Sequence, residues 1–173
     1  MSTIIGIDPG SRVTGYGLVR SAGDRLEHVG HGCIRMSHPE QPERLREIFE
    51  GLGRVVEEFA PDEAAVEEVF MGRNAASALK LGQARGSAIV ACLAHGVPVA
   101  EYSARKVKQA VAGSGAAGKE QVQHMVKVLL GVKGDIAEDA ADALAVAICH
   151  AHTRDSLVRI TAASSYSRRR FRR

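Results

Sequence analysis

Apolar residues follow two spacings along the chain, alternation in its first part and helical repeats later. β-Branched and apolar runs bounded by turn residues such as Pro9-Gly10 predict strands. These predicted strands are residues 3–8, 14–20, 26–34, 64–69 and 98–101. Between the third and fourth strands, apolar residues at helical spacing predict an amphipathic helix from about Pro42 to Phe59, with the proline in its first turn.

Capping residues mark the helices of the second half. Asn74 and Ser103 are good N-cap residues for helices that end near Gly96 and Ala112. A further helix carries apolar side chains on one side over residues 122–129. The sequence therefore predicts helices that alternate with the last two strands.

The last predicted helix begins at Asp135, which forms a capping box with Glu138, and ends near His152. The sequence after it ends in a basic run, since five of the last six residues are arginine. We expect residues 1–155 to form one domain and residues 156–173 to be a basic, disordered tail.

Three strands followed by alternating helices and strands are typical of an α/β fold with a mixed central sheet flanked by helices. Asp8 and Glu67 then end neighbouring strands, and Asp139 and Asp142, three residues apart, share one face of the last helix. Small residues let this helix lie close to the sheet. They are Ala137, Ala140, Ala141, Ala143, Ala145 and Ala147.

The four carboxylates are thus expected to converge. A buried carboxylate at a strand end is costly unless its charge is compensated, and hard oxygen ligands suit Mg²⁺ and Mn²⁺. Taken one at a time, Asp8 and Asp139 would more often be structural, as helix caps or ion-pair partners. Taken together, the four residues predict a metal site for phosphoryl chemistry.

Composition narrows the class of protein. The chain of 173 residues suits one domain with a full core, and it contains no apolar stretch long enough to span a membrane. No secretory signal follows Met1, and the three cysteines form neither a Cys-x-x-Cys pair nor an even set. We therefore expect a cytoplasmic protein with reduced thiols.

Charge is distributed unevenly. Residues 1–72 carry 7 basic and 13 acidic side chains, residues 73–133 carry 9 and 2, and residues 134–167 carry 2 and 5. The carboxylates thus lie in acidic segments on either side of a basic one. This arrangement fits a polyanion held beside a metal ion. Solvated helix faces would produce a similar distribution.

Four segments closely resemble the RuvC family of bacterial Holliday junction resolvases: residues 6–17, 66–70, 78–86 and 139–144. The resemblance covers roughly residues 1–152. It implies a ribonuclease H-like fold, a homodimer, and paired symmetric nicking of four-way DNA junctions that leaves 5′-phosphate and 3′-hydroxyl ends. It also implies action with the branch-migration proteins RuvA and RuvB.

Matched by motif, the catalytic and metal-binding residues would be Asp8, Glu67, Asp139 and Asp142. Two Mg²⁺ ions for each active site are expected, and Mn²⁺ would substitute for them. Glu68 is adjacent to Glu67, but alternation along a strand points it to the opposite face.

Residues predicted to contact DNA lie between the carboxylates. Phe70 follows the strand that carries Glu67 and is expected to stack on an unpaired base, although a buried core position is the alternative. The predicted phosphate contacts are Arg73, Lys80, Arg85, Lys106, Lys108 and Lys119. Lys108 and Lys119 match the family best, and any one of these side chains is also compatible with simple solvation.

Two glycine patterns bear on loop structure and helix packing. Residues 113–120 imitate nucleotide-binding loops, but Glu120 replaces the required hydroxyl and a helix precedes the motif, so we predict a mobile loop that presents Lys119. Gly82 and Gly86 permit close helix approach, either for self-association or for packing on the sheet.

Alternative functions remain at this point. A related nuclease would cut RNA or an RNA–DNA hybrid, and a non-catalytic protein would bind junctions without cutting them. An actin-like ATPase would need a second domain, for which 173 residues are too few.

Overall fold

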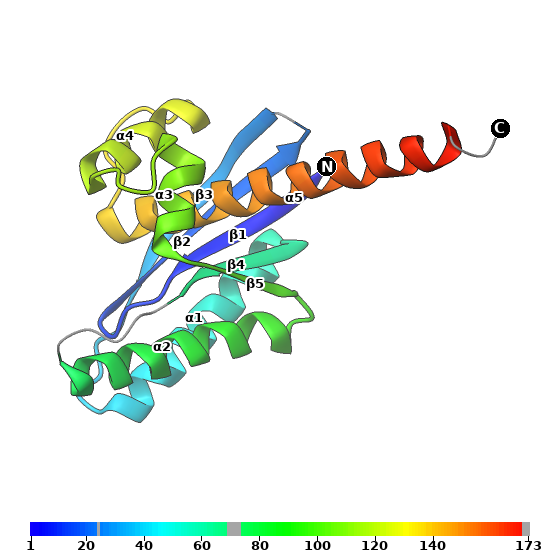
Figure 1. Cartoon of the computed structure of the whole chain (residues 1–173). Helices are drawn as coiled ribbons and strands as arrows, with labels where there is room; N and C mark the ends of the chain where they lie inside the picture. Colours follow the sequence, from blue (N-terminus) through cyan, green and yellow to red (C-terminus); the bar gives the residue numbers. More distant parts are fainter. Residues whose placement is uncertain (24, 69–73, 171–173) are drawn as a thin grey trace.

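A five-stranded mixed sheet runs through the centre of the described part of the chain (Figure 1). The computed structural model describes residues 1–23, 25–68 and 74–170, with side chains as far as Leu157. The strands are β1 (Ser2–Asp8), β2 (Val13–Ala22), β3 (Arg25–Arg35), β4 (Glu63–Glu67) and β5 (Val99–Tyr102). The helices are α1 (Gln41–Phe59), α2 (Ala75–Ala94), α3 (Ala104–Ala112), α4 (Lys119–Leu130) and α5 (Glu138–Arg170).

The strand order explains how distant carboxylates meet. The order is β3-β2-β1-β4-β5, in which β1 and β3 run antiparallel to β2, while β1, β4 and β5 are parallel. The last paired residues of β1 and β4 are Ile7 and Val66. Asp8 and Glu67 therefore leave the sheet side by side, which confirms that they end neighbouring strands.

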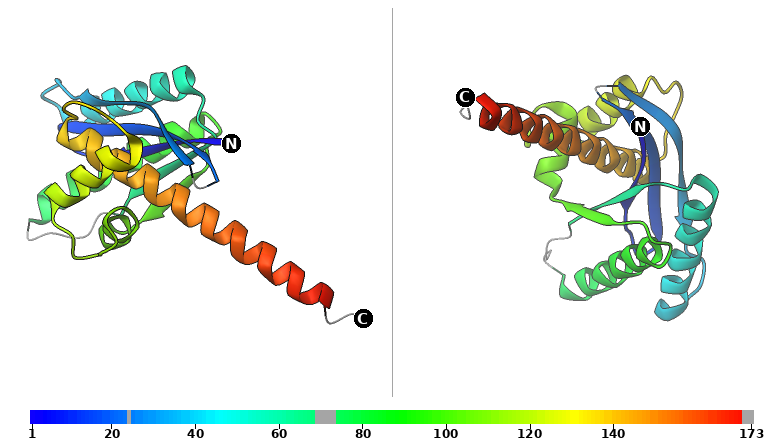
Figure 2. Two further views of the ribbon diagram at one scale, coloured as in Figure 1. Left: turned by 90° about the horizontal axis from the view of Figure 1, so that it is seen from above. Right: turned by 90° about the vertical axis from the view of Figure 1, so that its right-hand side faces the viewer.

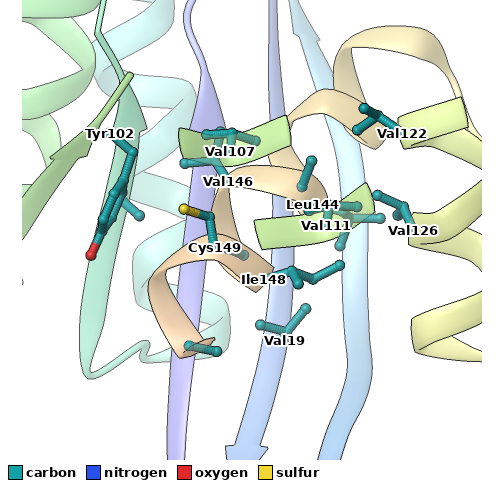
Figure 3. Close-up of a cluster of buried hydrophobic side chains, with 14 of the residues drawn as sticks. Val19, Tyr102, Val107, Val111, Val122, Val126, Leu144, Val146, Ile148 and Cys149 are labelled. Atoms are coloured by element: carbon teal, nitrogen blue, oxygen red, sulfur yellow. The ribbon is translucent and has the colours of Figure 1, made fainter. Parts of the chain in front are cut away.

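Helices cover both faces of the sheet. One buried cluster lies between the sheet and α1 and α2, and the other lies between the sheet and α3, α4 and α5 (Figure 2). Figure 3 shows the second cluster, in which Leu144 and Ile148 of α5 pack near Val107 and Val111 of α3. Apolar burial on both faces supplies the main stabilisation of the fold.

Small residues bring α5 onto the sheet. A Cβ atom at Gly6 of β1 would clash with the main-chain oxygen of Ala143, well inside the 3.0 Å that real contacts respect. The predicted role of the alanines is confirmed for five of them, since Ala140, Ala141, Ala143, Ala145 and Ala147 are buried. Ala137 differs, because it precedes the helix and is exposed.

Most predicted boundaries agree with the structure, and both helix caps are confirmed. Asn74 accepts a hydrogen bond from the Ser77 N–H, and Ser103 accepts one from the Lys106 N–H. The predicted strand 64–69 corresponds to β4, which ends at Glu67. Val69, the last residue of the predicted strand, lies outside the described residues.

The last helix was predicted wrongly at both ends. It begins at Glu138 rather than Asp135, and Asp135 instead forms an ion pair with Lys127. It also continues past His152 to Arg170, because no glycine or proline interrupts residues 138–170. Residues 156–170 are therefore helical here. The division into a domain and a basic tail stays a prediction.

No helix among the described residues combines the length and the apolar character needed to cross a membrane.

Candidate active site

Asp8 stands at the end of β1, where β1 and β4 diverge, and its side chain is half-buried. Burial, together with the negative charges of Asp142, Glu67 and Asp139, raises the pKa of Asp8 from 3.8 to about 7. The positive charge of Lys119 acts in the opposite direction. A carboxyl group with a pKa near neutrality exchanges its proton readily, which is typical of functional sites.

Glu67 is the last residue of β4. Burial, followed by the charge of Asp142, raises the pKa of its carboxyl group, and Lys108 and Lys119 counteract this effect. Glu68, the next residue, follows the end of β4 and is exposed.

The main chain at Asp139 lies directly against β2 because Gly15 has no side chain. Gly15 of β2 pairs directly with Asp8, and a Cβ atom at Gly15 would clash with the main-chain oxygen of Asp139. The first turn of α5 therefore lies directly on the Asp8–Gly15 pair. Asp139 is in this first turn, where the helix dipole favours negative charge.

Asp142 comes one turn further along α5 and is joined to a lysine. The Nζ atom of Lys119, at the start of α4, lies 2.9 Å from Asp142 Oδ2 and also donates a hydrogen bond to Glu138. Burial lowers the pKa of Lys119, but the hydrogen bonds and charges of Glu138 and Asp142 outweigh it and raise the pKa above the ordinary value. Lys119 is therefore positively charged where it contacts Asp142.

A cavity of about 240 Å³ opens beside these groups. Its polar wall contains Glu67, Asp142, Lys108 and Lys119. The remaining lining is apolar and comes from Ala104, Val107, Val122 and Ala145. Two carboxylates facing two ammonium groups suit a phosphate together with its counter-ion.

The donor chemistry of the four carboxylates fits hard divalent cations. Asp8 is electrostatically coupled to the other three, so the site concentrates the negative charge that such a cation neutralises. Among the described residues, however, no three His, Cys, Asp or Glu side chains already stand at the spacing of a metal site. One Asp142 oxygen forms an ion pair with Lys119.

The predicted DNA contacts fall into separate groups. Phe70 and Arg73 lie outside the described residues. Lys108 and Lys119 line the cavity, whereas Lys80 is exposed on α2.

The other two predicted phosphate contacts make interactions within the protein. Lys106 places its Nζ atom 4.7 Å from the centre of the Tyr102 ring. Arg85 forms an ion pair with Glu101 and donates a hydrogen bond to the main-chain oxygen of Glu67.

Sequence reasoning missed Glu101 and Glu138. Glu101 gives no signal in the sequence, because its partner Arg85 belongs to another element and meets it only in the fold. Glu138 was assigned to a capping box, but its carboxylate pairs with Lys119. The sequence offered one sign that Glu138 belongs to the site, namely its position next to Asp139.

The family match and two similar relatives agree on one family. The family described as "Crossover junction endodeoxyribonuclease RuvC" matches residues 4–150. The chain is 58% identical to a protein of that name from Photobacterium profundum, over 98% of each chain. It is 56% identical to another from Aeromonas salmonicida, over 99% of this chain and 100% of the relative.

Solved structures agree with this result. Thermus thermophilus RuvC in complex with Holliday junction substrate superimposes with a TM-score of 0.84 at 36% identity, over 90% of this chain and 96% of that one. The yeast mitochondrial Holliday junction resolvase Ydc2, at 13% identity and a TM-score of 0.66, covers 93% of this chain and 85% of its own, and shares the fold.

Proposed function

The chain belongs to the RuvC family of crossover junction endodeoxyribonucleases, and we propose that it cuts four-way DNA junctions with Asp8, Glu67, Asp139 and Asp142 as its metal-binding residues. The observation that supports this assignment is the packing of the first turn of α5 on the Asp8–Gly15 pair, beside a cavity lined by Glu67, Asp142 and two lysines. The ribonuclease H-like fold is shared with the Thermus relative, whose structure contains a Holliday junction substrate.

Two Mg²⁺ ions, for which Mn²⁺ would substitute, supply activation of a water molecule and stabilisation of the leaving oxygen when they are bound. Asp8 would hold the ions as a carboxylate, because their positive charge would oppose the burial and the neighbouring negative charges that raise its pKa. Lys108 and Lys119 place positive charge beside the scissile phosphate. Hydrolysis then leaves a 5′-phosphate and a 3′-hydroxyl.

We propose that α2 forms the contact between two copies of the chain. Leu79, Val90 and Leu93 are 70%, 54% and 55% exposed, and they follow one helical stripe. Gly82 and Gly86 belong to this stripe, and a Cβ atom placed on either would have no atom of another helix or strand within 4 Å, so they do not pack on the sheet. A second α2 helix would cover the stripe, and symmetric cutting of two strands requires two active sites.

This contact is tested by the molar mass in solution. Leu93→Glu should convert a dimer to a monomer in sedimentation equilibrium, because it buries a charge in the contact. Val128→Glu is the control, since Val128 is comparably exposed, at 57%, on α4. A monomeric wild type, or a Leu93→Glu variant that stays dimeric, would exclude this surface.

Three further assignments rest on the family and on charge. Phe70 would stack on a base at the junction, and Lys80 would contact phosphate from the exposed side of α2. We also propose that the protein acts in the bacterial cytoplasm with RuvA and RuvB. A pull-down with each purified protein on a junction tests the last point.

The function itself is tested with a labelled four-way DNA junction beside linear duplex and an RNA–DNA hybrid, with and without Mg²⁺. We expect paired symmetric nicks in the junction alone. The control is Asp142→Asn, which should bind the junction and lose cleavage by several orders of magnitude, because one metal-binding carboxylate is gone.

Each other result supports a different function. Cleavage of the hybrid would indicate a ribonuclease H-like enzyme with the same site. Tight junction binding without cleavage would indicate a binding protein. Undiminished cleavage by Asp142→Asn would remove Asp142 from the proposed site.

A further inference from the structure

Arg85 turns inward from α2 rather than toward solvent. Its side chain is 21% exposed, and its Nε atom donates a hydrogen bond to the main-chain oxygen of Glu67 at 3.2 Å. The Nη2 atom forms an ion pair with Glu101 of β5. The guanidinium group therefore joins α2 and β5 to the residue that ends β4.

The Glu67 oxygen needs this donor because of the residue that follows Asp8. In the parallel register of β1 and β4, Ile7 pairs with Val66. One step further, the Glu67 oxygen would accept a hydrogen bond from the N–H of residue 9. Residue 9 is proline, which has no N–H, and the pairing stops at this point. Arg85 thus takes the place of the missing strand donor.

Arg85 acts on Glu67 through the main chain. The positive charges that lower the pKa of the Glu67 carboxyl group come from Lys108 and Lys119, and Arg85 is not among them. The charge of Arg85 is instead satisfied by Glu101. Because the direction of a side chain follows from its backbone, fixing the peptide group after Glu67 fixes the carboxylate that points into the cavity.

We propose that Arg85 is a positioning residue for Glu67, in which its guanidinium group replaces the hydrogen bond that Pro9 cannot donate. This inference rests on the proposed role of Glu67 as a metal-binding residue. It replaces a direct phosphate contact as the main role of Arg85. Residues that orient metal ligands typically change metal affinity or activity by about 10- to 100-fold when they are removed.

The first test is Arg85→Ala, with two measurements. Binding of Mn²⁺ to the DNA-free protein, followed by electron paramagnetic resonance of free Mn²⁺, should weaken by about 10-fold. Single-turnover cleavage of a four-way junction at saturating protein should slow by about 10- to 100-fold. Junction affinity, measured in the Asp142→Asn background, should keep its dependence on salt.

Lys80→Ala is the comparison for a phosphate contact, since Lys80 is an exposed basic residue of the same helix. It should lower the slope of log affinity against log salt by nearly one. If Arg85→Ala lowers this slope in the same way and leaves Mn²⁺ affinity unchanged, Arg85 is a phosphate contact and the positioning role is overturned.

The decisive test is a second substitution. Pro9→Ala returns an N–H to residue 9, so the double variant Pro9→Ala/Arg85→Ala should bind Mn²⁺ more tightly than Arg85→Ala alone. A general loss of packing would not be repaired in this way. Equal or weaker Mn²⁺ binding by the double variant would contradict the proposal.

Circular dichroism melting shows whether Arg85→Ala folds. If it does not, Glu101→Gln removes the ion pair and keeps Arg85, and it should weaken Mn²⁺ binding to a smaller extent. An unchanged affinity would then overturn the proposal. A wild type that binds Mn²⁺ but cuts no junction would refute the proposed function and leave the Mn²⁺ test of Arg85 in force.

Discussion

The imidazole ring of His150 on α5 lies 2.7 Å from the carboxylate of Glu63 on β4, measured from Nε2 to Oε2. Its Nδ1 atom lies 2.8 Å from the hydroxyl group of Tyr102 on β5. β4 carries Glu67, and α5 carries Asp139 and Asp142. The two elements that supply three of the four carboxylates are therefore joined at a point away from the site.

Loss of this buried link should destabilise the protein. His150→Ala leaves the Tyr102 hydroxyl and one Glu63 oxygen without this partner and opens a cavity, so the free energy of unfolding should fall by about 2–4 kcal/mol. Urea denaturation measures the change. His152→Ala is the control, because His152 is only half-buried and bonds to a single main-chain oxygen, that of Ala110. Equal losses in the two variants would contradict the role of the link.

Asp8 should make stability depend on pH in the absence of divalent cations. Its pKa is about 7 in the folded protein and 3.8 when unperturbed, so the folded state binds more protons between these values. The Asp8 carboxyl group therefore does not change the free energy of unfolding below about pH 4. Its ionisation lowers that free energy as pH rises toward 7, and the loss persists above pH 7.

Asp8→Asn removes this effect because the amide does not ionise. In EDTA the variant should exceed the wild type by a few kcal/mol at pH 8 and match it at pH 4. Thermal melting at several pH values measures this difference. A constant difference across the range would show that the carboxyl group does not titrate in the expected window.

Lys119 should matter for cleavage more than for folding. Its side chain is 53% exposed, and ion pairs of this exposure contribute about 0–1 kcal/mol. Lys119→Ala should therefore melt within a few degrees of the wild type but cut a junction about 10- to 100-fold more slowly, since a positive charge beside the phosphate is gone.

Lys127→Ala is the matched control for this experiment. Lys127 is on the same helix, α4, and forms an ion pair with Asp135 away from the cavity. A large fall in melting temperature for Lys119→Ala alone would make that lysine structural.

Gly15 should tolerate no side chain. In Gly15→Ala the new methyl group would push against the main-chain oxygen of Asp139, so the first turn of α5 must move away from Asp8. We expect a loss of about 1–3 kcal/mol in stability and strongly reduced Mn²⁺ binding. Gly118→Ala is the control for melting, because its Cβ position is open and its φ of -70° suits any residue. Normal Mn²⁺ binding by Gly15→Ala would show that α5 adjusts without cost.

Local patterns were sufficient for most helices and strands, whereas the choice of the four carboxylates stays a prediction. Alternation, helical spacing and the caps Asn74 and Ser103 are properties of neighbouring residues, so the sequence predicted them correctly. The end of the last helix was missed because the expected stop near His152 had no glycine or proline behind it.

By itself, the sequence determined the mixed α/β fold, the strand ends that carry Asp8 and Glu67, and the family, through motifs between residues 6 and 144 that the family match over residues 4–150 confirms. Only the tertiary structure decided which charges meet. It placed Lys119 against Asp142 and Glu138, turned Arg85 toward Glu67 and Glu101, and joined His150 to Glu63. These pairs come from elements that are distant in the chain, and packing on the sheet, rather than local spacing, brings them within hydrogen-bonding distance.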